Sequence, residues 1–102
     1  MEFKEKLKQY GIEPSAYLSI ARRRAKALGY NLPVNFTNDD VHKLEYDGIK
    51  FGAKNNKDYI IYLLTEGQDK ADKMRKAYLS RMLAKTNDRT ITKKMRLTRI
   101  NW

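Results

Sequence analysis

The amino-acid sequence predicts a single α+β domain, with N-terminal helices, a central β-hairpin and a basic C-terminal helix. Three observations support this fold class. Apolar residues recur at helical spacing toward both ends of the chain, and two alternating segments flank Asp47-Gly48 in the middle. The 102 residues, 41% of them hydrophobic, are enough for one modest core. The chain has no cysteine, so neither a disulfide nor a thiolate metal site can stabilise it.

Two helices are expected before residue 30. In the first, Phe3, Leu7 and Tyr10 are spaced four and three apart and line one side of a short helix. The second is expected to begin near Pro14 and to stop at Gly29. Its apolar stripe consists of Tyr17, Leu18, Ala21, Ala25 and Leu28. The following segment, "YNLPVNFTNDD" at 30–40, lacks a helical period and is predicted to be a connector.

The hairpin follows from the stretch "HKLEYDGIKFGA" at 42–53. If Asp47 and Gly48 form a two-residue type I′ turn, the paired residues are Tyr46 with Ile49, Leu44 with Phe51 and His42 with Ala53. All six then lie on one packing face, which makes the lone histidine a partly buried structural residue. The other face pairs Glu45 with Lys50 and is expected to direct Lys43 and Lys54 toward solvent.

The apolar run "DYIIYLL" at 58–64 is compatible with two structures. Its β-branched and aromatic residues favour a third antiparallel strand. The alternative is a short helix with Asp58 as N-cap and Gly67 as its C-terminal stop.

A longer helix is predicted from Asp69 to about Lys85, with Ala71, Met74, Ala77, Tyr78 and Met82 facing inward. Residues 1–85 are therefore expected to form the compact domain, and residues 86–102 a basic tail. The tail could form a last short helix or strand, or remain disordered until it binds a partner. Trp102 is expected to be exposed.

The formal net charge of +10 is concentrated in the second half of the sequence. Residues 1–51 have 9 basic and 7 acidic residues, whereas residues 52–102 have 13 and 5. Such clustering predicts a nucleic acid or another polyanion as the partner. The candidate phosphate contacts are Arg22, Arg23 and Lys26 in the second helix, Lys70, Lys73, Arg75, Lys76 and Arg81 in the long helix, and Lys93, Lys94, Arg96 and Arg99 in the tail.

The sequence does not predict an enzyme. Asp39, Asp40, Glu45, Asp47 and Asp58 cluster around the hairpin, as in a metal-dependent nuclease, but the proposed register separates them. No second histidine is available to share a metal, and the glycines do not have P-loop spacing. No metal and no cofactor are expected. No apolar segment is long enough to cross a membrane, so an intracellular protein is predicted.

Residues 42–82 also resemble a family of small basic proteins from large DNA viruses of algae and protists and from their virophages. The matching positions are Phe51 and Gly52, then Asp58 and Tyr59, then Arg75, Tyr78 and Arg81. Met82 stands where that family has a histidine. The resemblance implies a viral protein, located in the virion or in the host cytoplasm or nucleus, and it implies no activity.

The predicted function is therefore binding of DNA or RNA, mainly through the phosphate backbone. The alternative is a non-enzymatic structural protein, such as a minor capsid component, whose basic face contacts viral structural proteins. Trp102 and the apolar connector would then be interface anchors.

Overall fold

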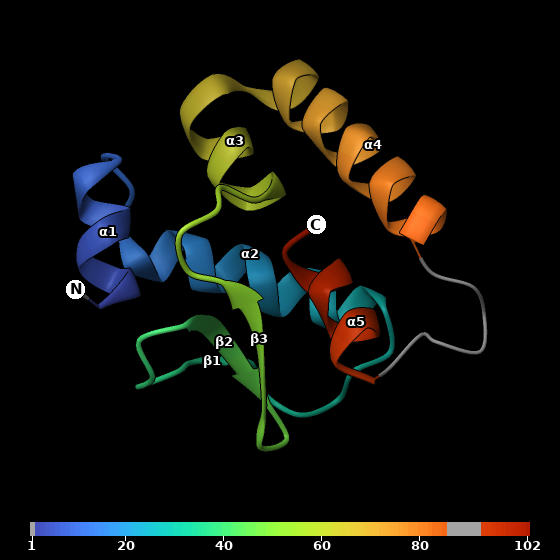
Figure 1. Cartoon of the computed structure of the whole chain (residues 1–102). Helices are drawn as coiled ribbons and strands as arrows, with labels where there is room; N and C mark the ends of the chain where they lie inside the picture. The colour runs from blue at the N-terminus through green and yellow to red at the C-terminus, as the bar shows by residue number, and fades with distance from the viewer. Residues whose placement is uncertain (1, 86–92) are drawn as a thin grey trace.

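The computed structural model describes residues 2–85 and 93–102, except for the side chains of residues 83–85 and 94. Five α-helices, three strands and a 3₁₀-helix follow one another within these residues (Figure 1). They are α1 (Phe3–Gln9), α2 (Pro14–Ala27), β1 (Asn35–Phe36), β2 (His42–Tyr46), β3 (Ile49–Ala53), α3 (Tyr59–Glu66), α4 (Gln68–Lys85), α5 (Lys93–Leu97) and η1 (Thr98–Ile100). The predicted α+β class is confirmed.

The hairpin has the predicted register, with Leu44 opposite Phe51. Asp47 and Gly48 both have positive φ angles, 49° and 77°, as a type I′ turn requires. The sheet gains its third strand from the connector, because β1 pairs antiparallel with β2 and gives the strand order β1-β2-β3.

The prediction of a strand at 58–64 is wrong, because this segment forms α3. Asp58 lies just before the helix, and its side chain accepts a hydrogen bond from the Ile61 main-chain N–H at 2.9 Å. Gly67, with a φ of 90°, follows the last residue. The helix therefore has the N-cap and the stop that the alternative interpretation named. The apolar run is continuous because the start of α3 is buried in the core.

Both faces of the hairpin are covered, which contradicts the prediction that Lys43 and Lys54 face solvent. Leu44 and Phe51 are completely buried, but so is Lys43, which is 1% exposed, and Lys54 is 7% exposed. Beside Lys43, a Cβ atom added at Gly52 would lie only 2.8 Å from Nδ2 of Asn101. The C-terminal segment, residues 93–102, therefore covers the face that was expected to be solvated.

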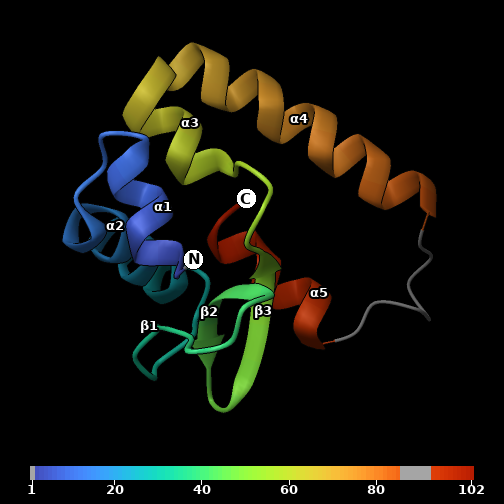
Figure 2. The ribbon, with the colours of Figure 1, turned by 60° about the vertical axis from the view of Figure 1, so that its left-hand side comes forward.

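Residues 93–102 belong to the folded domain and do not form a separate tail. Leu97, Ile100 and Asn101 are buried, and the C-terminal residue lies between the sheet and α3–α4 in both views (Figures 1 and 2). Arg24 of α2 also holds this segment by donating hydrogen bonds to the main-chain oxygens of Ile100 and Trp102. Residues 86–92, the first part of the predicted tail, lie outside the described residues.

Most of the described side chains of helix α4 are exposed. It runs back from α3 across one side of the molecule and continues past the C-terminal segment (Figure 2). Among its described side chains only Ala71 is buried. Within the part of the chain that the structure describes, no helix has both the length and the apolar character needed to cross a membrane.

Candidate functional site

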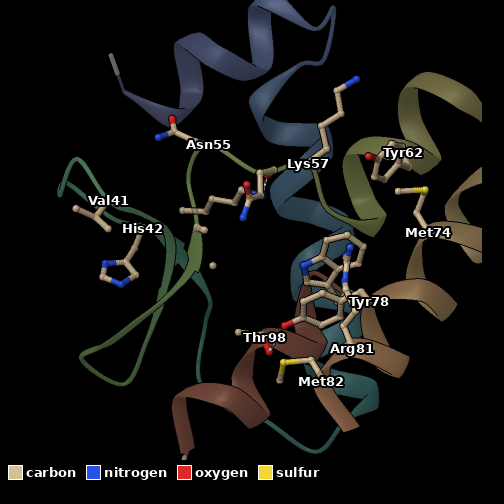
Figure 3. A pocket seen from close by; sticks show the side chains of 15 residues that line it. Val41, His42, Asn55, Lys57, Tyr62, Met74, Tyr78, Arg81, Met82 and Thr98 are labelled. Carbon is tan, nitrogen blue, oxygen red and sulfur yellow. Dashed lines mark hydrogen bonds between the residues drawn. The ribbon is translucent and has the colours of Figure 1, made fainter. Parts of the chain in front are cut away.

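A groove of about 840 Å³ lies between the hairpin, the start of α3, the inner side of α4 and the C-terminal segment (Figure 3). Its walls come from four separate parts of the sequence. They include Val41 and His42 of the hairpin, Asn55, Asn56 and Lys57 of the loop before α3, Tyr62, Met74, Tyr78, Arg81 and Met82 of the two helices, and Thr98 and Trp102 near the C-terminus.

Two stacked aromatic rings line the groove. The rings of Tyr78 and Trp102 are parallel within 5°, with centroids 4.3 Å apart. The main-chain oxygen of Trp102 accepts hydrogen bonds from Arg24 at 2.7 Å and from Arg75 at 2.8 Å, and Tyr78 donates to the Thr98 hydroxyl at 3.3 Å. The expectation that Trp102 is exposed is wrong, because this stacking and these hydrogen bonds leave it half-buried.

The charged residues of the groove are all potential cations. Lys57 and Arg81 are exposed, and the ammonium of Lys57 lies 5.8 Å from the centroid of the Tyr62 ring. Of the residues described as lining the groove, none is aspartate or glutamate. An anion could therefore enter the groove without repulsion from a carboxylate in its wall.

His42 has a structural partner at the edge of the groove. Its Nδ1 lies 2.8 Å from Oδ2 of Asp39, and the Asp39 carboxylate also accepts hydrogen bonds from the main-chain N–H groups of Val41 and His42. These hydrogen bonds, that of the His42 side chain first, lower the pKa of Asp39 well below its usual range. The ammonium of Lys50 is 3.7 Å from the same carboxylate, although Glu45 is its cross-strand neighbour.

Behind the groove lies a buried polar network centred on Asp58. Oδ2 of Asp58 accepts hydrogen bonds from the Lys43 ammonium at 2.9 Å, the Tyr17 hydroxyl at 2.5 Å and the Asn101 amide at 3.2 Å. Lys43 also donates to the main-chain oxygen of Asn56. The network connects α2, the hairpin, the start of α3 and the C-terminal segment.

The electrostatics of this network indicate a structural role for it. Burial lowers the pKa of Lys43, and the negative charge of Asp58 opposes that shift. Burial also raises the pKa of Tyr17 well above its usual value, and the neighbouring Asp58 charge raises it further. Because Asp58 is 0% exposed and Lys43 is 1% exposed, neither side chain is open to a substrate. Among residues 2–85 and 93–102, no three aspartate, glutamate or histidine side chains are placed to share a metal ion.

The residues predicted to contact phosphate do not form one surface. On α4, Lys70, Lys73 and Lys76 are exposed, and Lys73 and Lys76 lie on the side of the helix opposite Tyr78, as the helical spacing of 3.6 residues per turn requires. Arg81 belongs to the groove side instead. The outer side of α4 and the groove are therefore two separate basic surfaces.

The other predicted residues lie elsewhere. Arg22 donates hydrogen bonds to the Val34 main-chain oxygen and to the Asn35 side chain, so it holds the connector, whereas Arg23 and Lys26 are exposed on α2. Arg75 and Arg99 line a cleft of about 280 Å³ together with Arg24.

In the C-terminal segment, Lys93 lies 3.9 Å from Asp47 at the hairpin turn, and Arg96 is exposed. The side chain of Lys94 lies outside the described part of the structure.

Sequence reasoning did not identify several residues of the groove as functional candidates. Lys57, Asn55 and Asn56 lie in the loop before α3, and nothing in that loop matches a motif. The sequence feature that could have located this loop is Asp58. As the N-cap of α3 it fixes the start of the helix at residue 59, and so the position of the loop that precedes it.

Comparison of the chain with protein-family models, with curated proteins and with solved structures gives no match. The resemblance to viral proteins therefore stays a prediction, and the function has to be inferred from the two basic surfaces.

Proposed function

We propose that the protein binds nucleic acid mainly through the phosphate backbone, and that its role is binding and not catalysis. The observation that carries this proposal is the uncompensated charge of α4. Lys70, Lys73 and Lys76 are exposed, and within the described part of the chain none of them has an ion-pair partner. Cations without a carboxylate partner are available to neutralise phosphates and to displace their counterions.

The spacing of these cations suits a phosphate backbone. Lys73 and Lys76 are three residues apart and are therefore neighbours on the outer side of α4. Arg23 and Lys26 repeat this spacing on α2, and both are exposed. Contacts of this kind give affinity and position without reading the base sequence.

A salt titration against two unrelated DNA duplexes tests the proposal. Lys73→Ala and Lys76→Ala should each weaken binding to both duplexes equally and should reduce the slope of log K against log salt by roughly one. The matched control is Lys8→Ala, which removes the same charge from the exposed side of α1 and should leave the slope nearly unchanged. Loss of affinity for only one duplex would indicate base readout instead.

Two outcomes would contradict the proposal. A wild-type protein that binds no nucleic acid at low salt would leave the alternative, a structural or protein-interaction component. Cleavage of plasmid DNA in the presence of a divalent cation, lost in an Asp40→Ala variant, would show an enzyme.

A further inference from the structure

We infer that the groove between the hairpin and α4 binds an unpaired nucleotide, so that the protein holds single-stranded nucleic acid with at least one base in the groove. This inference rests on the proposed function and adds to it the form of nucleic acid that is recognised. Three properties of the groove lead to it: its size, its charge and its aromatic side chains.

The groove has the size of a small-ligand site and is recessed between the hairpin and α4. A volume of about 840 Å³ is within the range of about 300–1,000 Å³ that is usual for small-ligand sites. A base in a duplex is stacked and paired, so it cannot reach a recessed site unless it is extruded. A base of a single strand can turn into the groove at little cost.

The charge of the groove fits the phosphates on either side of such a base. Arg81 comes from α4 and Lys57 from the loop before α3, and both line the groove. Figure 3 shows the Lys57 side chain extending away from Tyr78 and Arg81. Its ammonium lies 5.5 Å from the centroid of the Tyr10 ring, so Lys57 marks the rim of the groove. Both cations are exposed, and neither has an ion-pair partner among the described residues. A strand would therefore meet Arg81 in the groove and Lys57 where it leaves the groove at the rim.

The aromatic side chains supply surfaces for a base. The stack of Tyr78 and Trp102 uses one face of each ring, and both rings are half-buried groove residues. Tyr62 faces the groove from α3. Stacking on aromatic rings beside a positively charged path is the usual way in which proteins bind single strands without sequence preference. An acidic peptide would satisfy the cations but would leave these ring faces unused.

The side chains that hold the rings also make the site rigid before binding. The hydrogen bonds from Arg24 and Arg75 fix the main chain of Trp102, and the Thr98 hydroxyl accepts from Tyr78. A ring that is already fixed loses little conformational freedom when a base stacks on it.

Trp102 is the single tryptophan of the chain, so its fluorescence reports directly on the groove. The wild-type protein should be titrated with oligothymidylate of about 12 nucleotides, which is within the range of site sizes for single-strand binding. Two matched ligands complete the test: an abasic strand with the same number of phosphates, and a duplex of the same length.

Oligothymidylate should quench the Trp102 emission and bind about 5- to 150-fold more tightly than the abasic strand, which is the effect of stacking one base. The abasic strand and the duplex should bind without quenching, through the outer side of α4. Arg81→Gln should weaken oligothymidylate binding more than duplex binding, whereas the matched variant Lys76→Gln should weaken both equally.

The inference and the proposed function fail in different ways. Equal affinity for oligothymidylate and the abasic strand, with unchanged emission, would overturn the inference and leave phosphate binding intact. Quenching by a polyglutamate peptide but by no nucleic acid would also overturn it. Absence of binding to all three nucleic acids at low salt would overturn both proposals.

Discussion

At the scale of single residues, Asp58 joins parts of the chain that are far apart in sequence. Its carboxylate caps α3 and accepts hydrogen bonds from Tyr17, Lys43 and Asn101. An ion pair as deeply buried as that of Asp58 and Lys43 adds little net stability compared with apolar residues of the same size. Removing only one partner is costly, because the other charge stays buried without compensation.

Asp58→Ala should lower the free energy of unfolding by about 3–5 kcal/mol. The double variant Asp58→Ala, Lys43→Met should be more stable than Asp58→Ala alone, because no unpaired ammonium is left in the core. Urea denaturation followed by circular dichroism measures both. The control is Glu66→Ala, an exposed carboxylate, which should change stability by no more than about 0.5 kcal/mol. A loss under about 1 kcal/mol for Asp58→Ala would contradict the structural role.

The raised pKa of Tyr17 predicts an alkaline dependence of stability. Because its pKa is higher in the folded than in the unfolded protein, its contribution is complete below about pH 10 and is lost as the pH rises further. The urea midpoint of wild type should therefore fall more steeply above pH 10 than that of Tyr17→Phe. The lowered pKa of Lys43 changes stability with pH in the opposite direction. Because Lys43 is present in both proteins, its effect largely cancels when their urea midpoints are compared. Parallel curves for the two proteins would contradict the prediction.

At the scale of elements, the β2–β3 hairpin depends on two glycines in the left-handed region. Gly48 has a φ of 77° and Gly52 a φ of 81°, so an alanine at either position costs about 1–2 kcal/mol of backbone strain. They differ in their surroundings, because an added Cβ atom meets nothing within 4 Å at Gly48 but lies 2.8 Å from Asn101 at Gly52.

Gly52→Ala should therefore destabilise the protein more than Gly48→Ala, by about a further 1–3 kcal/mol of overpacking. The two variants are matched controls for each other, since they make the same substitution at nearly the same φ. Thermal and urea unfolding of both give the comparison. An equal loss of unfolding free energy in the two variants would mean that the Asn101 side chain does not restrict the space at residue 52.

The elements also differ in how far the sequence could predict them. The register of the hairpin was predictable, because the turn residues and the apolar alternation agree on one pairing. Lys43 was wrongly predicted to face solvent. The alternation of apolar and polar residues defines the two faces of the hairpin, but it does not show whether another part of the chain covers the second face. Residues 58–64 were predicted as a strand but form a helix. A short, continuous apolar run shows no period, so only the flanking Asp58 and Gly67 distinguish a helix from a strand here.

The candidate site was less predictable than the fold. Tyr78 and Arg81 were singled out from the sequence of α4, but the residues that face them across the groove lie on the hairpin, on the loop before α3 and near the C-terminus. These residues come together through tertiary packing. The periodicity of apolar residues and the spacing of motifs in one sequence do not predict which distant segments pack against each other.

At the scale of the whole molecule, the C-terminal segment closes the core. Leu97 and Ile100 are completely buried, and burial of a side chain of this size contributes about 1.5–3 kcal/mol. Asn101 adds a partner for Asp58, and Trp102 one for Tyr78. Together these contacts are comparable to the total stability of a small domain.

Deleting residues 93–102 should therefore abolish cooperative unfolding, which circular dichroism during a thermal scan would detect. The control variant, Arg96→Ala with Arg99→Ala, removes two exposed charges from the same segment and should keep the cooperative transition. A truncated protein with the melting temperature of wild type would show that the segment is an independent tail.

The position of Asp58 in the chain has a consequence for folding kinetics. Its partners Tyr17 and Asn101 are 41 residues before it and 43 after it, so the network closes two long loops. Loop closure of this length costs about 3 kcal/mol of chain entropy for each loop, so the local helices and the hairpin are expected to form before the network does. The network is therefore expected to assemble after the rate-limiting step. In stopped-flow experiments Asp58→Ala should then speed unfolding and leave the refolding rate almost unchanged.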